Sequence, residues 1–467
     1  MNTLSIFDAA REAPDTIALI DGTNLLSFRD VAERTKPLAA ALIATRPRVL
    51  ALTPRADTES LLWLYAAFAT GTPVLTLHQR ATPAERSAAL ELVGATEPPA
   101  ATDAVFEPQT LPPVAGSTAL AFIPTSGSTG TPRLVELSRD AVLASARASE
   151  QNIGWETTDR WLLCLPLAHT GALSIVLRCL LARQTVLLFE PSAGGLLGDL
   201  EPLLRVAQQA TLISVVPSVL AAMLDAGFVP PSRLRAVLVG GAGCSPALCQ
   251  RAYAARVPLL TSYGLTETGS QVVTRGYAQR LDPVRVRNGV VSAGYALVGV
   301  AVRLDDGEPA TISIRSPSLF SGYAGQGPAP LGADGFFRTG DHGVLGHDGE
   351  LYVRGRSDDV IVSGGENVDP LEVEAALVAL PGVQAACVFG TPSARFGQVV
   401  TAVLVTGDRA LGQASHLAEL LADRLARHKL PRRALITDSL PLTASGKVDR
   451  CGVWMRFGAA FDDPAGA

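Results

Sequence analysis

The stretch Thr125-Ser126-Gly127-Ser128-Thr129-Gly130-Thr131-Pro132-Arg133 lies between an apolar segment and a segment of helical periodicity. The apolar segment, 119–124, is expected to form a strand, and Ser138 is placed to cap the helix that follows. Successive small hydroxyl and glycine residues expose hydrogen-bond donors, and Arg133 adds positive charge, so the loop can bind a polyphosphate. It is not a P-loop, because GxxxxGK[ST] is absent. Taken alone, such a loop is more often a flexible connection.

Short apolar segments alternate with amphipathic segments around this loop and beyond it, as far as residue 262. Helices are expected over 171–181 and after Ser245-Pro246, a pair that suits an N-cap and the first helical position. Alternation of this kind predicts an α/β fold with doubly wound sheets. The expected strands are 119–124, 161–165, 185–189, 211–216, 236–240 and 259–262.

The pattern changes twice toward the C-terminus. After Val290, glycine and proline become frequent, and short alternating strands such as 311–315 predict a β-rich subdomain. A second change comes at the polar segment 356–358, where we place a domain boundary. We therefore predict an N-terminal domain of residues 1–355 and a small α+β C-terminal domain of residues 356–467. The expected elements around the boundary are a strand at 350–353, a helix at 370–380 and a strand at 385–389.

The composition argues against several classes of function. Lys and Arg number 39, and Asp and Glu number 44, so the formal net charge is −5 and gives no reason to expect nucleic acid. The N-terminus lacks a basic segment followed by an apolar one, and the longest apolar stretch, 172–182, contains Arg178. The six cysteines include no CxxC pair, which favours buried thiols in a reducing compartment. We expect a cytoplasmic protein without stable membrane insertion.

Further segments follow the loop in a fixed order. They are Ser262-Tyr263-Gly264-Leu265-Thr266-Glu267-Thr268, Phe337-Arg338-Thr339-Gly340-Asp341, Gly355-Arg356-Ser357-Asp358-Asp359, Ser363-Gly364-Gly365-Glu366-Asn367 and Pro441-Leu442-Thr443-Ala444-Ser445-Gly446-Lys447. With them the chain resembles the superfamily of acyl- and aryl-CoA synthetases, luciferases and peptide-synthetase adenylation enzymes, from residue 18 to residue 450. The resemblance implies activation of a small carboxylic acid as an acyl-adenylate, with ATP, Mg²⁺ and coenzyme A. It also implies that the C-terminal domain is mobile.

The resemblance implies roles that suit this chemistry. A carboxylate attacking the α-phosphorus of ATP brings two anions together, so the site must offset charge and fix geometry. Glu267 matches the magnesium-binding glutamate, Asp341 the residue that accepts the ribose hydroxyls, and Lys447 the lysine that bridges carboxylate and phosphate. Thr266 would contact the α-phosphate, and Tyr263 would stack on adenine. The other nucleotide-binding positions implied are Thr125, Ser126, Gly127, Ser128, Thr129, Gly130, Arg133, Gly241, Ala242, Gly243, Ser262, Gly264 and Arg356, with Thr129 also placed at the metal.

The same resemblance implies an acid-binding pocket. His169 matches an aromatic or histidine position that borders this pocket and gates it. Two stretches, 161–178 and 261–274, resemble the o-succinylbenzoate–CoA ligases of menaquinone biosynthesis, although related enzymes acting on benzoates share parts of them. Arg178 pairs either with a second substrate carboxylate or with an acidic side chain of the protein. The pocket wall is expected to include His169, Ser174, Gly241, Gly264, Gly269, Ser270 and Gln271.

Alternatives remain open at this point. The acyl acceptor is coenzyme A or a separate carrier protein, and the protein is either a monomer or a homo-oligomer. A nucleotide-binding protein without catalysis is the alternative from another class, and the presence of Glu267 and Lys447 argues against it. Each of these residues also has a purely structural interpretation when it is taken alone. Glu267 suits the role of a negative charge at a helix N-terminus, Asp341 that of a turn residue, and Lys447 that of a solvated lysine in a loop.

Some positions depart from the pattern of the superfamily. Thr131 and Arg133 replace the usual lysines near the loop, and Leu134 replaces the usual glycine. Because arginine keeps the charge, we expect Arg133 to retain contact with pyrophosphate. Asp358 matches the hinge about which the C-terminal domain rotates. His342 and His347 flank a glycine-containing turn and are expected to be solvated rather than metal-bound.

Overall fold

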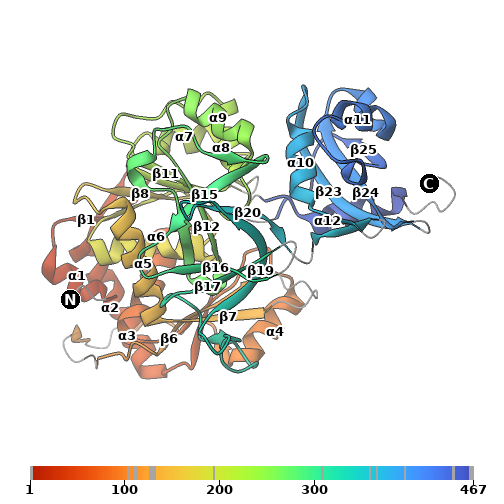
Figure 1. Ribbon diagram of the computed structural model, residues 1–467. Helices are drawn as coiled ribbons and strands as arrows, with labels where there is room; N and C mark the ends of the chain where they lie inside the picture. The colour runs from red at the N-terminus through yellow and green to blue at the C-terminus, as the bar shows by residue number, and fades with distance from the viewer. Residues whose placement is uncertain are drawn as a thin grey trace.

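The computed structural model describes residues 4–102, 106–108, 111, 113–125, 133–192, 195–306, 310–356, 359–363, 366–393, 396–443 and 447–461, except for the side chains of Arg356, Asn367 and Ala459. The described residues form three β-sheets with helices packed on them. Two sheets belong to an N-terminal lobe, residues 4–356, and the third belongs to a C-terminal lobe, residues 359–461. Figure 1 shows the C-terminal lobe, in blue, beside the N-terminal lobe.

The first sheet contains the strands on both sides of the 126–132 loop. Its order is β18-β7-β6-β4-β3-β5. Strands β3 to β6 pair in parallel, whereas β7 runs antiparallel to β6, with Thr125 opposite Arg133. The bounds are β3 (Val49–Leu52), β4 (Val74–Thr76), β5 (Ala95–Thr96), β6 (Ala119–Thr125), β7 (Arg133–Ser138) and β18 (Gly322–Tyr323).

The loop therefore joins two strands, and the second of them, β7, was not expected between the loop and Ser138. Leu134, Val135 and Leu137 are buried in the sheet, and pairing with β6 and β18 satisfies the backbone of this segment. The helix begins only at Arg139, where the Ser138 hydroxyl accepts the Ala141 N–H at 3.2 Å, as an N-cap should.

The second sheet has fourteen strands among the described residues, in the order β16-β17-β19-β20-β15-β13-β12-β11-β10-β8-β9-β1-β2, with β14 beside β15. It runs parallel from β1 through β9, β8, β10 and β11 to the first half of β12, and then becomes antiparallel at β13. The bounds are β1 (Ile17–Asp21), β2 (Asn24–Ser27), β8 (Arg160–Leu163), β9 (Thr185–Leu188), β10 (Leu212–Val215), β11 (Ala236–Val239), β12 (Leu259–Leu265), β13 (Ser270–Thr274), β14 (Val286–Arg287), β15 (Val290–Ala296), β16 (Ala301–Leu304), β17 (Thr311–Arg315), β19 (Phe337–Leu345) and β20 (Leu351–Arg356).

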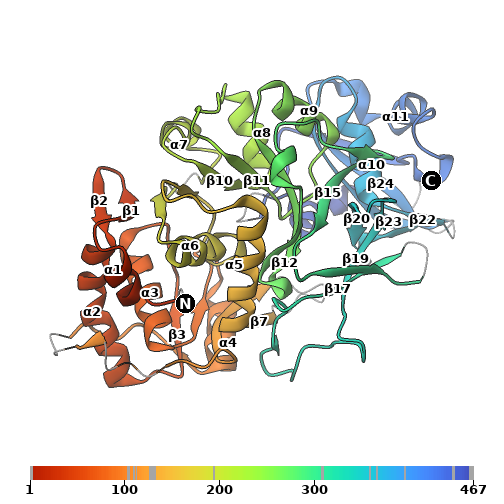
Figure 2. The same cartoon turned by 60° about the vertical axis from the view of Figure 1, so that its left-hand side comes forward.

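Helices α5 and α6 pack on each other between the two sheets (Figure 2). Helix α5 contacts β7 of the first sheet and β13 of the second, and α6 contacts β8, β9 and β13. Eleven of the residues of α6 are buried, Arg178 among them, so this helix is a core element rather than an amphipathic surface helix. The helices of the N-terminal lobe are α1 (Ile6–Glu12), α2 (Phe28–Thr45), α3 (Thr58–Thr70), α4 (Pro83–Val93), α5 (Arg139–Ile153), α6 (Thr170–Ala182), α7 (Leu200–Ala207), α8 (Pro217–Asp225) and α9 (Pro246–Ala254).

The C-terminal lobe has its own sheet and its own hydrophobic core. The sheet order is β22-β21-β24-β23, with β25 parallel to β24. Helix α10 packs on β23, and Val373, Leu377 and Val388 are buried in their common core. The elements are β21 (Ile361–Ser363), β22 (Glu366–Val368), α10 (Pro370–Val378), β23 (Val383–Ser393), β24 (Gly397–Thr406), α11 (Ala414–Leu421), β25 (Arg433–Thr437) and α12 (Arg450–Phe457), with short 3-10 turns at Arg409–Gly412, Arg427–Lys429 and Gly458–Phe461.

Two further expectations need correction. The strand placed at 350–353 continues to Arg356, so Arg356 lies in β20 and not in a loop. His342 is buried in β19, with its Nδ1 atom 3.3 Å from the Ala310 carbonyl oxygen, because it points into the sheet packing rather than toward solvent. His347 is exposed, as expected. Within the described ranges, no helix is long and apolar enough to cross a membrane.

Candidate active site

The candidate site lies where β12 leaves the parallel half of the second sheet. The 3-10 turn Thr266–Thr268 follows β12 directly. The buried hydroxyl of Thr268 accepts the Leu265 N–H at 2.9 Å and donates to the Ser270 carbonyl at 2.7 Å. These bonds hold Thr266 and Glu267 at the carboxyl end of β12, the edge at which open α/β sheets bind ligands.

Glu267 contacts two residues from distant parts of the chain. The Tyr323 hydroxyl donates to Glu267 Oε1 at 2.9 Å, and the Phe320 N–H donates to the Glu267 carbonyl at 2.8 Å. The Arg133 guanidinium lies over the Tyr323 ring, 5.2 Å from its centroid. Sequence analysis did not identify Tyr323, because one tyrosine in a glycine-rich segment gives no signal of this contact.

Strands β12, β19 and β20 bring together the positions expected at the nucleoside. The Tyr263 hydroxyl donates to Asp341 Oδ2 at 2.7 Å, and the Asp341 N–H donates to the Thr339 hydroxyl at 3.1 Å. Asp341 is only 7% exposed, so its carboxylate is fixed inside the sheet rather than in a solvated turn. Arg356 is the cross-strand partner of Asp341 on β20.

Lys447 reaches across from the C-terminal lobe to the N-terminal lobe. Its backbone is held by Thr443, whose N–H donates to the Lys447 carbonyl at 2.7 Å and whose hydroxyl accepts the Lys447 N–H at 3.2 Å. A Cβ atom placed on Gly241 would lie 2.9 Å from Lys447 Cε and 3.1 Å from Nζ. The end of the Lys447 side chain is therefore packed against Gly241, in the segment that follows β11.

His169 directly precedes α6 and lies near enough to Lys447 to feel its charge. Its ring lies 5.8 Å from the ring of His78, centroid to centroid, and its buried Nε2 atom has no hydrogen-bond partner among the described residues. Burial, and then the neighbouring His78 and Lys447, lower the pKa of His169 to about 4. The imidazole is therefore neutral near pH 7. Sequence analysis missed His78, which is distant in sequence from every motif.

The remaining pocket positions form a small wall between β13 and α6. The hydroxyls of Ser174 and Ser270 lie 3.5 Å apart, and Ser270 has a φ of 127°, a strained value for a residue with a side chain. A Cβ on Gly264 would lie 2.0 Å from the Ser270 carbonyl oxygen, so glycine is required there. Gln271 departs from the expected wall, because its side-chain amide donates to Ser149 of α5 at 3.0 Å.

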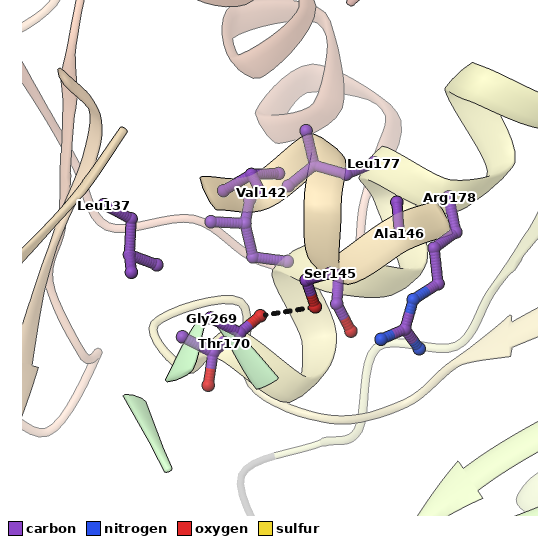
Figure 3. A pocket seen from close by; sticks show the side chains of 10 residues that line it. Leu137, Val142, Ser145, Ala146, Thr170, Leu177, Arg178 and Gly269 are labelled. Carbon is purple, nitrogen blue, oxygen red and sulfur yellow. Dashed lines mark hydrogen bonds between the residues drawn. The ribbon is translucent and has the colours of Figure 1, made fainter. Parts of the chain in front are cut away.

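Arg178 lines the inner end of this region. Figure 3 shows it with Ser145 and Gly269, which are joined by a hydrogen bond of 3.3 Å. The pocket is narrow, with about 10 Å³ of space, which is about the room for one water molecule. Arg178 is 2% exposed, and its Nε and Nη2 atoms have no hydrogen-bond partner among the described residues. Its guanidinium lies 5.4 Å from the Trp161 ring centroid, and burial lowers the pKa of Arg178 to about 10.

Some of the other predicted nucleotide-binding positions lie among the described residues. Gly241, Ala242 and Gly243 are exposed after β11, and the Ser262 hydroxyl donates to the Val239 carbonyl at 3.2 Å. Thr125 ends β6, where its hydroxyl lies 3.4 Å from the Arg133 carbonyl oxygen. Outside the described residues lie Ser126, Gly127, Ser128, Thr129, Gly130, Asp358 and the side chain of Arg356.

Comparisons with known proteins cover nearly the whole chain. The model of the family described as AMP-binding enzyme matches residues 92–324, and the model described as AMP-binding enzyme C-terminal domain matches residues 372–447. The 2-succinylbenzoate–CoA ligase of Bacillus pumilus is 31% identical over 94% of each chain. The corresponding ligase of Listeria monocytogenes serotype 4b is 32% identical, over 94% of this chain and 96% of its own.

Solved structures show the same likeness. The o-succinylbenzoate CoA synthetase of Bacillus subtilis, in complex with the acyl-adenylate intermediate OSB-AMP, superposes with a TM-score of 0.83 at 27% identity, over 97% of each chain. A double mutant of that enzyme bound to the product analogue OSB-NCoA gives a TM-score of 0.68 at 26% identity, over 97% of this chain and 98% of its own. The present arrangement is therefore closer to the acyl-adenylate complex. On this similarity in sequence and structure, the chain belongs to the family of AMP-binding enzymes that includes the 2-succinylbenzoate–CoA ligases.

Proposed function

We propose that the chain is an ATP-dependent o-succinylbenzoate–CoA ligase of menaquinone biosynthesis, working in the cytoplasm. In the first half-reaction a substrate carboxylate attacks the α-phosphorus of ATP, which gives an acyl-adenylate and releases pyrophosphate. In the second, the thiol of coenzyme A displaces AMP and forms the thioester. Family membership and the relative solved with OSB-AMP support this assignment.

The residues of the site suit the first half-reaction. Lys447 places a positive charge at the Gly241 segment, where it would offset the repulsion between carboxylate and phosphate. Asp341 would accept the ribose hydroxyls, next to the Tyr263 hydroxyl that already bonds to it. Thr266 would contact the α-phosphate from the end of β12. The neutral His169 ring would border the acid without adding a second positive charge.

Glu267 fits a magnesium ligand. Mg²⁺ takes oxygen ligands, usually from one or two carboxylates together with phosphates and water. Within the described residues, no group of three or more His, Cys, Asp or Glu side chains could hold a metal by itself. When bound, Mg²⁺ would neutralise phosphate charge, and Thr129 is proposed as a second contact. Glu267 would hold the ion through the oxygen that Tyr323 leaves available.

The second half-reaction requires a different arrangement. Lys447 must leave and a path must open for the pantetheine arm of coenzyme A, which we propose as the acceptor in preference to a carrier protein. We propose that residues 356–467 rotate against residues 1–355 about Asp358. The close approach of Lys447 to Gly241 and the higher TM-score with the OSB-AMP complex support the present arrangement as the one for adenylation.

Arg178 is the observation that favours a dicarboxylic acid. Thr170, Ser174 and Arg178 recur every four residues on α6, so they share one face, and all of them line the pocket. Helical side chains lean toward the N-terminus, which directs Arg178 back toward His169. A buried guanidinium without an acidic partner among the described residues suits an anionic ligand. o-Succinylbenzoate carries one carboxylate to react and another that would pair with Arg178, which requires the narrow pocket to widen.

The test is acid-dependent pyrophosphate release across a panel of acids. We expect the highest kcat/KM with o-succinylbenzoate, compared with benzoate, salicylate, 4-hydroxybenzoate and medium-chain fatty acids. Arg178→Met should lower kcat/KM for o-succinylbenzoate by about 10²-fold or more, the loss typical of one buried charged contact. It should leave the slow reaction with benzoate unchanged. A higher kcat/KM with a monocarboxylic acid, or equal losses with both acids, would contradict the assignment.

A further inference from the structure

Three elements that are distant in sequence meet beside Glu267. Arg133 begins β7, Tyr323 ends β18, and Glu267 lies in the turn after β12. Strands β7 and β18 are paired, with Val135 opposite Tyr323, so Arg133 and Tyr323 belong to neighbouring strands. The phenol bonds to Glu267 Oε1 at 2.9 Å while the Arg133 guanidinium lies over the ring. The contacts run from Arg133 through Tyr323 to the carboxylate.

The Tyr323 side chain has little freedom to move. Its ring packs edge-on against Phe320, with centroids 4.9 Å apart, and Phe320 packs in turn against Phe337 at 5.1 Å. The Phe320 N–H also donates to the Glu267 carbonyl, so the same segment holds both the backbone and the side chain of Glu267.

Glu267 is thereby presented in one orientation. Oε1 is engaged by Tyr323, and Oε2 receives no hydrogen bond from any residue in the described part of the chain. An arginine suits the position above the ring better than a lysine, because its planar cation stacks on an aromatic face. Arginine, in place of the lysine usual in the superfamily, therefore suits the contact with the Tyr323 ring in this chain.

We propose that Tyr323 is a positioning residue that orients Glu267 toward the magnesium of ATP, and that Arg133 steadies Tyr323. The proposal rests on the proposed function of Glu267. It adds a second role for Arg133 beside the expected contact with pyrophosphate. Residues that orient a metal-binding carboxylate typically change metal affinity by about 10- to 100-fold when they are removed. Tyr323→Phe keeps the ring and its packing and removes only the hydroxyl.

The experiment measures ATP binding by calorimetry, with Mg²⁺ and with EDTA, on the full chain. We expect Tyr323→Phe to weaken ATP binding in Mg²⁺ by about tenfold and to leave binding in EDTA unchanged. The Mg²⁺ concentration for half-maximal adenylation should rise in parallel. Tyr352→Phe is the matched control. The hydroxyl of Tyr352, in β20, donates to Glu350 Oε2 at 2.8 Å, and this pair plays no part in the proposed site. The control variant should change neither binding constant.

Arg133→Lys tests whether Arg133 steadies Tyr323. We expect it to raise the magnesium requirement in the wild-type background, and to add nothing when Tyr323 is replaced by Leu, because the two side chains act as one unit. Unchanged Mg²⁺-dependent binding in Tyr323→Phe, or equal losses with Mg²⁺ and with EDTA, would overturn the inference. Glu267→Gln separates the inference about Tyr323 from the proposed role of Glu267. Normal magnesium dependence in that variant would refute the role of Glu267 itself.

Discussion

Lys447 brings a side chain of the C-terminal lobe to the candidate site, where it lies against Gly241. Because its ammonium would offset charge that develops while the carboxylate approaches ATP, its removal should affect one half-reaction. We expect Lys447→Ala to slow pyrophosphate release sharply and to spare thioester formation from supplied acyl-AMP. Single-turnover measurements of both steps on one preparation provide the check. Equal losses in the two steps would show that the lysine has a different role.

The burial of His169 should make the free energy of unfolding depend on pH. Its folded pKa is about 4, against an ordinary value of 6.5, so between these pH values the unfolded chain binds a proton that the folded chain does not. The free energy of unfolding therefore has its full value above pH 6.5. It falls as the pH drops toward 4, by as much as roughly 3 kcal/mol. His169→Phe should flatten this dependence in urea unfolding at pH 4.5 and 7. The exposed His347→Gln serves as the control and should keep the wild-type slope.

At the scale of elements, the Gly241 segment between β11 and α9 must let a side chain approach closely. Gly241 has a φ of +77°, and a Cβ there would meet Lys447 Cε at 2.9 Å. Gly241→Ala should therefore slow adenylation at least tenfold, since the lysine must move, and should also lower stability by about 1 kcal/mol through backbone strain. Gly227→Ala is the matched control, because Gly227 has a φ of +78° with nothing within 4 Å. A similar fall in adenylation rate in both variants would contradict the contact.

The element scale also shows what local sequence patterns can and cannot predict. The strands at 161–165, 185–189 and 211–216 were predicted to within a few residues, because buried parallel strands are continuous apolar runs. Strand β7 was missed, because its structure comes from pairing with β6 across the 126–132 loop and with the distant strand β18, and a local sequence pattern shows neither pairing. The same applies to Tyr323 and His78, whose neighbours are set by the folded sheets and not by spacing.

The motif residues were easier to predict than their environment. Glu267, Asp341 and Lys447 were picked out by type and order, and the structure packs Lys447 against Gly241, which follows β11, while Glu267 lies in the turn after the neighbouring strand β12. Their functional roles stay proposals. The burial of Asp341 and the approach of Lys447 to Gly241 depend on strand register and on the position of a separate lobe, which no local pattern encodes.

At the scale of the whole molecule, one chain must supply two arrangements of its lobes. The rotation is proposed at Asp358, which lies outside the described residues, between β20 and β21. A hinge residue absorbs a large φ/ψ change, and proline, with φ fixed near roughly −65°, cannot. We expect Asp358→Pro to retain pyrophosphate release in a single turnover and to lose consumption of coenzyme A from preformed acyl-AMP.

That outcome would separate a hinge from a simple loop cap. If Asp358 only caps a loop, proline should lower both half-reactions together through general destabilisation. An unaffected second step would also argue against the hinge. The melting temperature of the same preparation shows whether any loss reflects unfolding rather than restricted rotation.

The buried guanidinium of Arg178 has a consequence for the folding of the protein. Arg178 is buried and has no ionic partner among the described residues. Holding such a cation away from water costs on the order of a few kcal/mol of stability. Arg178→Met should therefore unfold at a higher urea concentration than the wild type while it loses its preferred acid. The wild type, but not this variant, should gain thermal stability from a dicarboxylate added without ATP. The N-terminal lobe is then less stable than its packing would allow, because it keeps Arg178 to bind the acid.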